Sequence, residues 1–547
     1  MSLLLAPLAV TAQQLQPDPG QRLLEQEQRR QAEERLLRQQ SAADNELTRR
    51  QRPPTVSEEE QNAPGFFVKR LILKDNTLLD DKTLRKILAR YEDREINRYQ
   101  IDRVINDLTN AYIDAGFITT RVYIPAQNIV ETKTLELVAV EGKIETLTVN
   151  DNRWPRKLER FMAFPTGSGG ILQLRDLEQG LDQMNRVPSA NARMQLHPGE
   201  QPGETRVLIT NEPKGEYRFY AGYDNLGQSS TGRNRVKLSG EADDVLNLND
   251  TWSAYYLGSR DSNAIAVTAS VPYEWWTLSQ SFTYSDYLIG VEPGMEIFGD
   301  TYSFVTSLEQ VVFRDARQKT SVFGALEVKN SGRILNDVIL APQPLTVFRL
   351  GARHTYRADR GFYAADFTVS QGAPIFGAHG NGGLQWDSPH SVFTKLEAGV
   401  SAYQGLLDWL SLRSSLRGQF APQGLYGSEQ IFLGDFNTVR GYINSNAVGD
   451  DGFYMRNELC VNLPPLAGIG WLDWLITKVQ PYAFLDGGYA IAKAESAGVT
   501  LLGTGVGGRF IWDRFTAEVL FGAPLTHSVW LPHDQPVTYF TMTLRAW

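Results

Sequence analysis

The chain has 547 residues, too many for one compact hydrophobic core, so two or more domains are expected. Hydrophobic residues make up 42% of the chain, yet no stretch reaches the roughly 20 consecutive apolar residues that a membrane helix needs, which argues against a helical membrane protein. The net charge of −9 argues against a nucleic-acid binder, and the single cysteine, Cys460, excludes an intramolecular disulfide framework and any site built from several cysteines.

The N-terminus has the character of a targeting segment. Leu3 to Val10 is a mostly apolar run, and Val10-Thr11-Ala12 offers small residues before a cleavage point, so residues 1–12 are expected to be the remainder of a secretory signal peptide. The basic residues that usually open such a peptide are missing.

A polar helix and a linker are predicted next. Residues 13–40 contain the charged, glutamine-rich stretch Gly20 to Gln40, with Glu25 and Arg29 in the favourable i,i+4 order. The helix has too few apolar positions for a core-facing stripe, so it needs solvent or a polar cavity around it. Residues 41–64 are polar and acidic with prolines, which favours a flexible linker whose mean reach would be roughly 25–29 Å.

Two small α/β modules of the order β-α-α-β-β are predicted from residues 65–141 and 142–213. In the first, the spacing predicts strands at 67–73, 118–124 and 134–140, and helices at 80–90 and 98–115. Gly116 is expected to end the second of these helices. In the second, strands are expected at 143–149, 190–196 and 205–210, and helices at 155–162 and 173–186. The repetition of one unit is a stronger signal than either copy alone.

The region 214–547 reads as strands and turns, with no helix expected. In Phe453 to Leu463, apolar residues alternate with polar ones, as on strands that face lipid outside and water inside. At roughly 20 residues per strand and connection, the region would form an antiparallel transmembrane β-barrel of about sixteen strands. Aromatic residues that suit the interfacial girdles of such a barrel are Trp252, Tyr255, Tyr256, Trp275 and Trp276.

Several patterns that could carry other chemistry favour plainer interpretations. Gly503 to Gly508 matches GxGxxG, but the sequence continues as a strand, whereas a dinucleotide site needs a helix there. The six histidines lack metal-ligand spacing, no G-x-S-x-G nucleophile motif occurs, and Cys460 is expected to be a packed small residue on the polar face of its strand. We therefore expect no enzyme activity, cofactor or metal.

This order of a polar helix, a linker, two modules and a barrel resembles the outer-membrane transporter of two-partner secretion systems. The modules look like the polypeptide-transport-associated (POTRA) domains of that family. The sharpest likeness is the motif Val439, Arg440, Gly441 and Tyr442, which in the family lies at the tip of a surface loop folded back into the lumen, here expected at 433–455.

A second motif supports the resemblance. Phe484, Asp486 and Gly488 match the family's Phe-x-Asp-x-Gly pattern on a barrel strand, and the resemblance implies that Arg440 pairs with Asp486. A guanidinium and a carboxylate can form a two-pronged, charge-assisted contact that would clamp a loop, although an ordinary surface ion pair would contribute little.

The resemblance implies a function without an energy-consuming site. Periplasmic modules would capture the N-terminal secretion domain of a large exoprotein, such as an adhesin, a haemolysin or a contact-dependent inhibition toxin, and the N-terminal helix would plug the lumen at rest. The expected partners are this exoprotein, outer-membrane lipid and the barrel-assembly machinery, with the transporter itself a monomer in the Gram-negative outer membrane. The alternatives are a barrel-assembly or insertion factor of the same superfamily and, from other classes, a small-solute porin or an outer-membrane enzyme.

Overall fold

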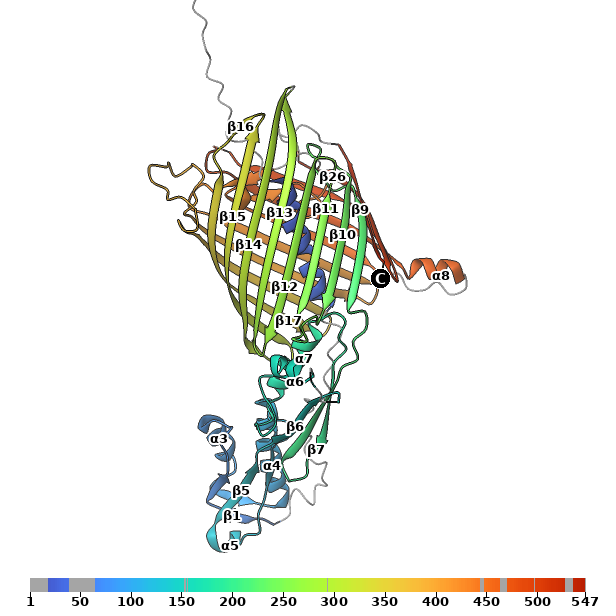
Figure 1. Ribbon diagram of the computed structural model, residues 1–547. Coiled ribbons are helices and arrows are strands. Elements are labelled where there is room, and N and C mark those ends of the chain that lie inside the picture. Colours follow the sequence, from blue (N-terminus) through green and yellow to red (C-terminus); the bar gives the residue numbers. More distant parts are fainter. Residues whose placement is uncertain are drawn as a thin grey trace, which may run out of the picture.

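The computed structural model describes residues 18–38, 64–151, 154, 156–292, 294–442, 447–462, 470–495, 497–526 and 535–546. A β-barrel with a helix inside it stands above two small α/β modules (Figure 1). Among the described residues, no helix is both long enough and apolar enough to cross a membrane. The predicted signal peptide (1–12) and nearly all of the predicted linker (41–64) lie outside the described residues.

The described residues form a closed antiparallel barrel of sixteen long strands, as predicted. The short β16 (Val338–Ile339) extends the hairpin between β15 and β17. The long strands are β9 (Tyr217–Asp224), β10 (Arg235–Asp243), β11 (Thr251–Gly258), β12 (Ser262–Tyr273), β13 (Trp276–Glu292), β14 (Met295–Arg314), β15 (Gln318–Leu335), β17 (Gln343–Ala358), β18 (Gly361–Gly372), β19 (Thr394–Leu407), β20 (Leu410–Phe420), β23 (Asp451–Val461), β24 (Val479–Ile491), β25 (Val499–Trp512), β26 (Phe515–Pro524) and β27 (Val537–Arg545). The barrel closes where β27 pairs with β9, from Thr541 opposite Asp224 to Arg545 opposite Tyr220.

Side chains alternate between the two faces of the wall. On β12, Ile265 and Val267 are exposed on the outer surface, whereas Ala264 and Ala266 are buried on the lumenal side. This alternation places apolar groups on the outer surface, as in barrels that face lipid, and polar and small residues on the lumenal side.

The structure corrects three details of the predicted barrel. Tyr255 does not belong to an outer girdle, because it faces the lumen beside the buried Leu24. A helix does occur in this region, α8 (Gly470–Ile476), which the sequence reading missed because seven residues are too short to show a helical period. The connection that carries the loop motif runs from 421 to 450, not 433–455, because residues 451–455 pair with β20 and β24 as part of β23.

The first module (65–141) has more elements than predicted. Its described elements are β1 (Phe66–Val68), β2 (Arg70–Lys74), α3 (Asp81–Leu88), β3 (Arg94–Ile96), α4 (Arg98–Asp114), β4 (Arg121–Tyr123), α5 (Ile129–Thr132) and β5 (Thr134–Val140). The strand predicted at 67–73 is two strands, since β1 pairs with the unpredicted β3 and β2 pairs in parallel with β5. The break falls where the amides of Lys69 and Arg70 both donate to the carbonyl of Lys133.

Local signals explain why α4 begins and ends where it does. At its start, Asn97 and Gln100 form a capping box, each side chain accepting from the other's backbone N–H at 3.0 and 2.9 Å. At its end, Gly116 adopts a φ of 96°, a conformation that L side chains rarely adopt. Between them, Val104, Leu108 and Tyr112 fill the module's core.

The second module (142–213) follows the predicted β-α-α-β-β order. It consists of β6 (Lys143–Val149), α6 (Arg156–Ala163), α7 (Leu174–Asn185), β7 (Arg193–Pro198) and β8 (Glu204–Thr210). Its sheet has the order β6-β8-β7, so β6 and β7 are edges.

The second module is joined to the barrel turns nearest to it by several side chains. Gln183 donates to the carbonyl of Glu274 at 2.9 Å, and Arg314 donates to Asp182 at 2.5 Å. Arg186 reaches the carbonyl of Asn249 at 2.7 Å. These contacts fix the module's α6–α7 side against the mouth of the barrel.

Candidate functional site

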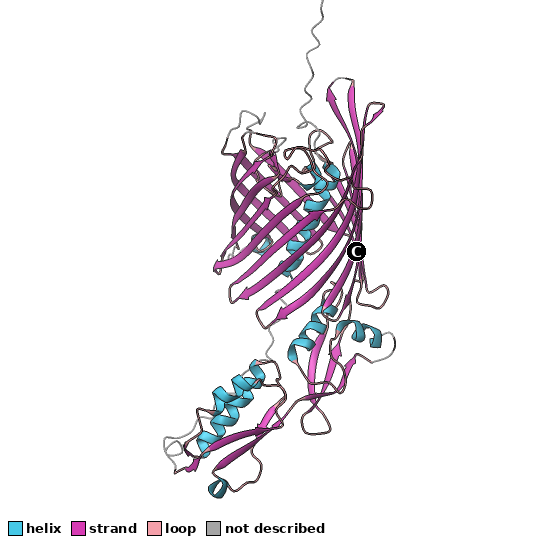
Figure 2. Cartoon of the chain, turned by 90° about the vertical axis from the view of Figure 1, so that its left-hand side faces the viewer, coloured by secondary structure: helices cyan, strands magenta, loops and turns pink. Residues whose placement is uncertain are grey.

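The N-terminal helix α1 (Pro19–Arg38) runs through the lumen, as Figures 1 and 2 show. Asp18 caps its start, accepting from the amides of Gly20 and Gln21 at 2.8 and 3.1 Å. The other carboxylate oxygen of Asp18 accepts from Ser285 on the barrel wall at 2.6 Å. Leu24 is fully buried against the small wall residues Ala264 and Ala266, which adds an apolar contact to the polar ones made by Asp18.

The long connection between β20 and β23 folds against the inner wall of the barrel. It contains the turn η4 (Gly427–Glu429) and the small hairpin of β21 (Ile431–Leu433) and β22 (Ala447–Gly449). Val439, Arg440 and Tyr442 follow β21 and are essentially inaccessible to solvent. The structure therefore brings the predicted loop motif into the barrel, against β23, β24 and β25.

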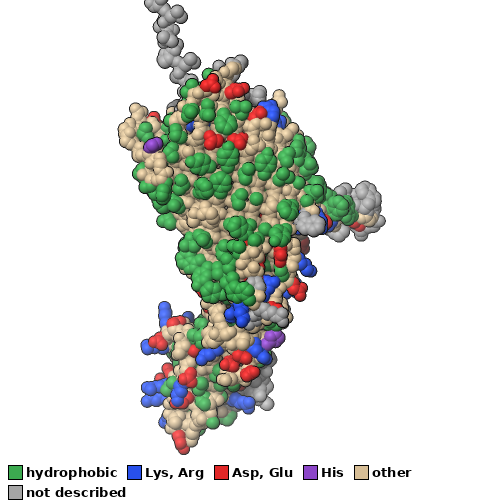
Figure 3. Space-filling model, viewed as in Figure 1, with side chains coloured by type: hydrophobic (Ala, Val, Ile, Leu, Met, Phe, Trp, Pro, Cys, Tyr) green, Lys and Arg blue, Asp and Glu red, His purple; other side chains and the backbone are tan. Residues whose placement is uncertain are grey.

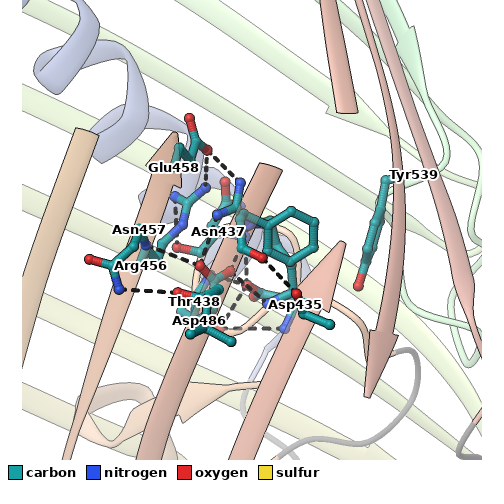
Figure 4. A network of polar contacts seen from close by, with 12 residues as sticks. Asp435, Asn437, Thr438, Arg456, Asn457, Glu458, Asp486 and Tyr539 are labelled. Carbon is teal, nitrogen blue, oxygen red and sulfur yellow. Dashed lines mark hydrogen bonds and ion pairs between the residues drawn. The ribbon is translucent and has the colours of Figure 1, made fainter. Parts of the chain in front are cut away.

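Arg440 is clamped from several sides. Its Nε donates to Asp486 Oδ2 at 2.6 Å and its Nη2 donates to Asp486 Oδ1 at 2.8 Å, which is the two-pronged geometry of a strong guanidinium–carboxylate pair. Its Nη1 donates to Glu458, and its guanidinium lies 4.1 Å from the ring centre of Phe484. Figure 4 shows Asp486 and Glu458 projecting from neighbouring strands into this network.

Glycines let the loop lie directly on the wall. A Cβ on Gly503 would lie 1.8 Å from the carbonyl oxygen of Arg440, so no larger residue fits there without displacing the loop. A Cβ on Gly488 would lie 3.0 Å from Val439, and Gly441 itself has a φ of 103°. The glycine-rich strand that superficially matched a dinucleotide motif is β25, and Gly503 serves this close approach.

Tyrosines secure the far side of the motif. The Tyr442 hydroxyl donates to the carbonyl of Leu502 at 2.5 Å, and the Tyr539 hydroxyl donates to the carbonyl of Tyr442 at 2.6 Å. The ring of Tyr539 also meets that of Phe436 edge-on, at 5.7 Å between centres.

One carboxylate connects the loop to α1. Asp435 Oδ1 accepts from the amides of Asn437 and Thr438, both at 2.8 Å, and so shapes the turn just before Val439. Its Oδ2 accepts from Gln26 of α1 at 2.8 Å. Figure 4 shows Asp435, Asn437 and Thr438 gathered beside the wall residues of the network. The helix and the loop motif therefore share Asp435.

A charged cluster on another part of the wall also reaches the helix. Its side chains project from alternate positions of β15 and β19, from β17 and from η4. The members are Glu327, Lys329, Arg349, Lys395, Glu397 and Glu429. Lys329 lies 3.8 Å from Glu25 of α1. Sequence analysis missed this cluster, although charges at alternate positions on the polar face of strands were its visible signal.

Sequence analysis also missed the residues that meet Arg440 because their strands lie next to one another in the barrel. Glu458 lies in the alternating stretch Phe453 to Leu463, but nothing in that stretch indicated a contact with Arg440, and Gly503 was predicted only to be part of a strand. Among the described residues, no group of three or more His, Cys, Asp or Glu is arranged to hold a metal ion. Cys460 is buried beside Phe436 and Tyr482.

Two acidic side chains meet where the second module joins the barrel. Glu159 of α6 is inaccessible to solvent, and burial raises the pKa of its carboxyl group. Burial, with the nearby Glu159 as second cause, raises the pKa of Asp244 in the β10–β11 turn to about 7. We therefore expect the Asp244 carboxyl group to change its protonation state near neutral pH.

Comparisons with known proteins agree with this architecture. Residues 203–510 match the family described as haemolysin secretion/activation protein ShlB/FhaC/HecB, and residues 66–142 and 143–198 each match a POTRA domain. The chain is 30% identical over 498 residues to the outer membrane transporter CdiB of Dickeya dadantii, covering 88% of this chain and 87% of that one. It is 31% identical to the hemolysin transporter protein ShlB of Serratia marcescens, covering 73% and 72%. The solved structure of CdiB from Escherichia coli superposes with a TM-score of 0.87 at 26% identity, covering 97% of this chain and 100% of that one.

Proposed function

Because this chain belongs to the ShlB/FhaC/HecB family and is an outer-membrane transporter of two-partner secretion, with its POTRA domains in the periplasm, we propose that α1 and the motif loop together close its lumen. The observation that carries the proposal is the sharing of Asp435 between Gln26 of α1 and the turn before Val439. A helix that leaves the lumen must break this contact, so its departure would release one support of the loop.

The dimensions and chemistry of α1 suit a removable plug. Its 20 residues span about 30 Å, which matches the thickness of a bilayer's hydrocarbon core. Its described contacts include hydrogen bonds that join Asp18 to Ser285 and Gln26 to Asp435, and an ion pair between Glu25 and Lys329, and water can replace all of these when the helix leaves. The polar lumen left behind would accept an extended chain without trapping it.

The cargo is a secreted partner exoprotein, and we infer that the periplasmic domains take up its N-terminal secretion domain. In the second POTRA domain β7 is an edge strand, and its backbone can add a strand from an extended polypeptide through main-chain hydrogen bonds. We further propose that the transporter acts as a monomer and is inserted into the outer membrane by the barrel-assembly machinery. On this proposal outer-membrane lipid surrounds the barrel, and the protein has no enzymatic activity of its own.

A reversible tether tests whether α1 must leave. A Cβ on Gly20 would lie 3.2 Å from Ser285 Cβ, slightly shorter than the usual spacing in a disulfide, so a small shift at the start of α1 would let Gly20→Cys with Ser285→Cys cross-link the helix to the wall. In a Cys460→Ser background, we expect oxidation to stop secretion of the partner exoprotein and reduction to restore it. Ser285→Cys alone is the matched control and should secrete under both conditions. Full secretion by the oxidised double variant would dismiss the plug.

A further inference from the structure

Helix α6 of the second POTRA domain turns an aromatic and basic face away from its own core. Glu159 and Ala163 are fully buried, whereas Lys157 and Phe161, four residues apart, are exposed on the other side. Phe161 is 58% exposed, and Trp154, just before the helix, is 72% exposed. Large aromatic side chains with this exposure on a periplasmic domain need an explanation.

The exposed face is held against the barrel, so its position is defined. The ring of Phe161 lies 5.9 Å from that of Tyr273, the last residue of β12. The backbone N–H of Glu274 donates to the carbonyl of Met162 at 2.7 Å, and Asn249 donates to the carbonyl of Glu159 at 2.9 Å. Helix α6 therefore cannot turn its aromatic face elsewhere without breaking contacts with the periplasmic turns.

Tyr273 marks the depth of this face relative to the membrane. It stands with Trp276 at the periplasmic end of the β12–β13 hairpin, and both are exposed on the outer surface. At the neighbouring end of β14, a bulge at Val312 leaves both Val312 and Phe313 exposed. Aromatic residues at the ends of barrel strands lie at the level of the lipid headgroups. Phe161 touches this girdle, so it lies at the same level.

The apolar surface is continuous across the junction. Figure 3 shows hydrophobic side chains gathered over the lower end of the barrel and reaching the neck above the charged periplasmic part of the chain. The charges of α6 also suit a headgroup layer. Arg156 is paired with Glu159, but the exposed Lys157 lies next to the aromatic face, where a lysine can extend its ammonium towards phosphate.

We propose that α6 lies in the periplasmic leaflet of the outer membrane, with Phe161 and Trp154 among phospholipids and Lys157 at their phosphates. The inference rests on the barrel being seated in that membrane and goes beyond it, because it assigns a lipid-binding surface to a periplasmic domain. The second POTRA domain is then held by the leaflet as well as by the barrel. Movement during secretion must then come from the first domain, from α1 and from the motif loop, while the second domain stays in place.

Spin-label accessibility in nanodiscs of phosphatidylethanolamine and phosphatidylglycerol tests the proposal. In a Cys460→Ser background, one nitroxide is attached at Phe161→Cys and, in a second protein, at Trp154→Cys. Val267→Cys, on the outer wall, reports separately whether the barrel is in lipid, and Val130→Cys, at a residue 71% exposed in the first domain, is the aqueous control. We expect labels at 161 and 154 to collide with oxygen several-fold more, relative to a water-soluble nickel complex, than the label at 130.

Three results would overturn the proposal, provided that the label at 267 shows lipid. The first is a label at 161 as open to nickel as the label at 130. The second is shielding from both reagents, which indicates contact with protein. The third is a spin–spin broadening that disappears on dilution with unlabelled protein, which indicates a second copy on this face.

Discussion

The pair formed by Arg440 and Asp486 gives the sharpest test of the loop site. Both side chains are essentially inaccessible to solvent, and removal of one partner of a buried pair typically costs about 3–5 kcal/mol. The structure favours the lower end of this range. Without Arg440, Asp486 still accepts from the backbone N–H of Asn457, and Glu458 still pairs with Arg509 at 2.7 Å.

We therefore expect Arg440→Ala and Asp486→Ala each to destabilise the bound loop by about 3 kcal/mol, a factor of roughly 150 in its equilibrium. The double variant should cost little more than either single one, because the second change removes a charge already left without its main partner. Arg440→Lys should rescue poorly, since an ammonium cannot reproduce the planar contact with both carboxylate oxygens.

The assay is secreted partner exoprotein per heat-modifiable folded barrel, measured for the wild type, the two single variants, the double variant and Arg440→Lys. Fully additive losses in the double variant would mean that the residues act separately. Wild-type secretion by Arg440→Ala would remove the clamp from the mechanism altogether.

Further predictions follow from the lumen and from the junction with the second domain. Deletion of residues 21–40 should raise ion conductance in planar bilayers with the barrel still folded, and unchanged conductance would refute the plug. Gly503→Val should displace the loop and reduce secretion as strongly as Arg440→Ala, because its Cβ would overlap the Arg440 carbonyl. Gly508→Val is the matched control and should be tolerated, since a Cβ there meets nothing within 4 Å. Equal effects of the two changes would contradict the close approach of the loop to Gly503. Deletion of residues 143–211 should abolish secretion but not membrane insertion, and normal export would dismiss the domain as a receptor. Since the pKa of Asp244 is raised to about 7, its docked form favours the protonated carboxyl, so docking should tighten as pH falls from 8 to 6 and loosen as pH rises. Hydrogen exchange of residues 244–250 would measure this, and Asp244→Asn should remove the pH dependence; the same dependence in that variant would assign it to another group.

Sequence patterns sufficed where structure is set by local periodicity. The alternation in Phe453 to Leu463 predicted the strands of a barrel, the length of the region predicted their number, and the helical spacing in Arg98 to Ala115 predicted α4. Several short elements were missed, including β3, α5 and α8, because three residues of strand or four to seven residues of helix complete at most about two periods and resemble turns.

Some residues of the site could likewise be predicted from the sequence, and others could not. Arg440 and Asp486 were found through motifs that resemble those of a known family, and the structure brings them together. Glu458 and Gly503 were not assigned to the site because their role depends on which strands lie side by side in the closed barrel. The contact of Gln26 with Asp435 joins residues more than 400 positions apart, so no local pattern could have indicated it.

We expect the partner exoprotein to pass through the lumen of this barrel. Thr368 and Phe367 are adjacent on β18; Thr368 shares the lumenal face with the buried Ser370, whereas Phe367 is exposed on the outer wall. A photo-cross-linking amino acid at each position, with a partner exoprotein stalled by a stably folded C-terminal domain, reports which face the moving chain touches. We expect the stalled exoprotein to cross-link at position 368 and not at 367. Cross-linking at 367 alone, or at neither position while the exoprotein is stalled across the membrane, would contradict passage through the lumen.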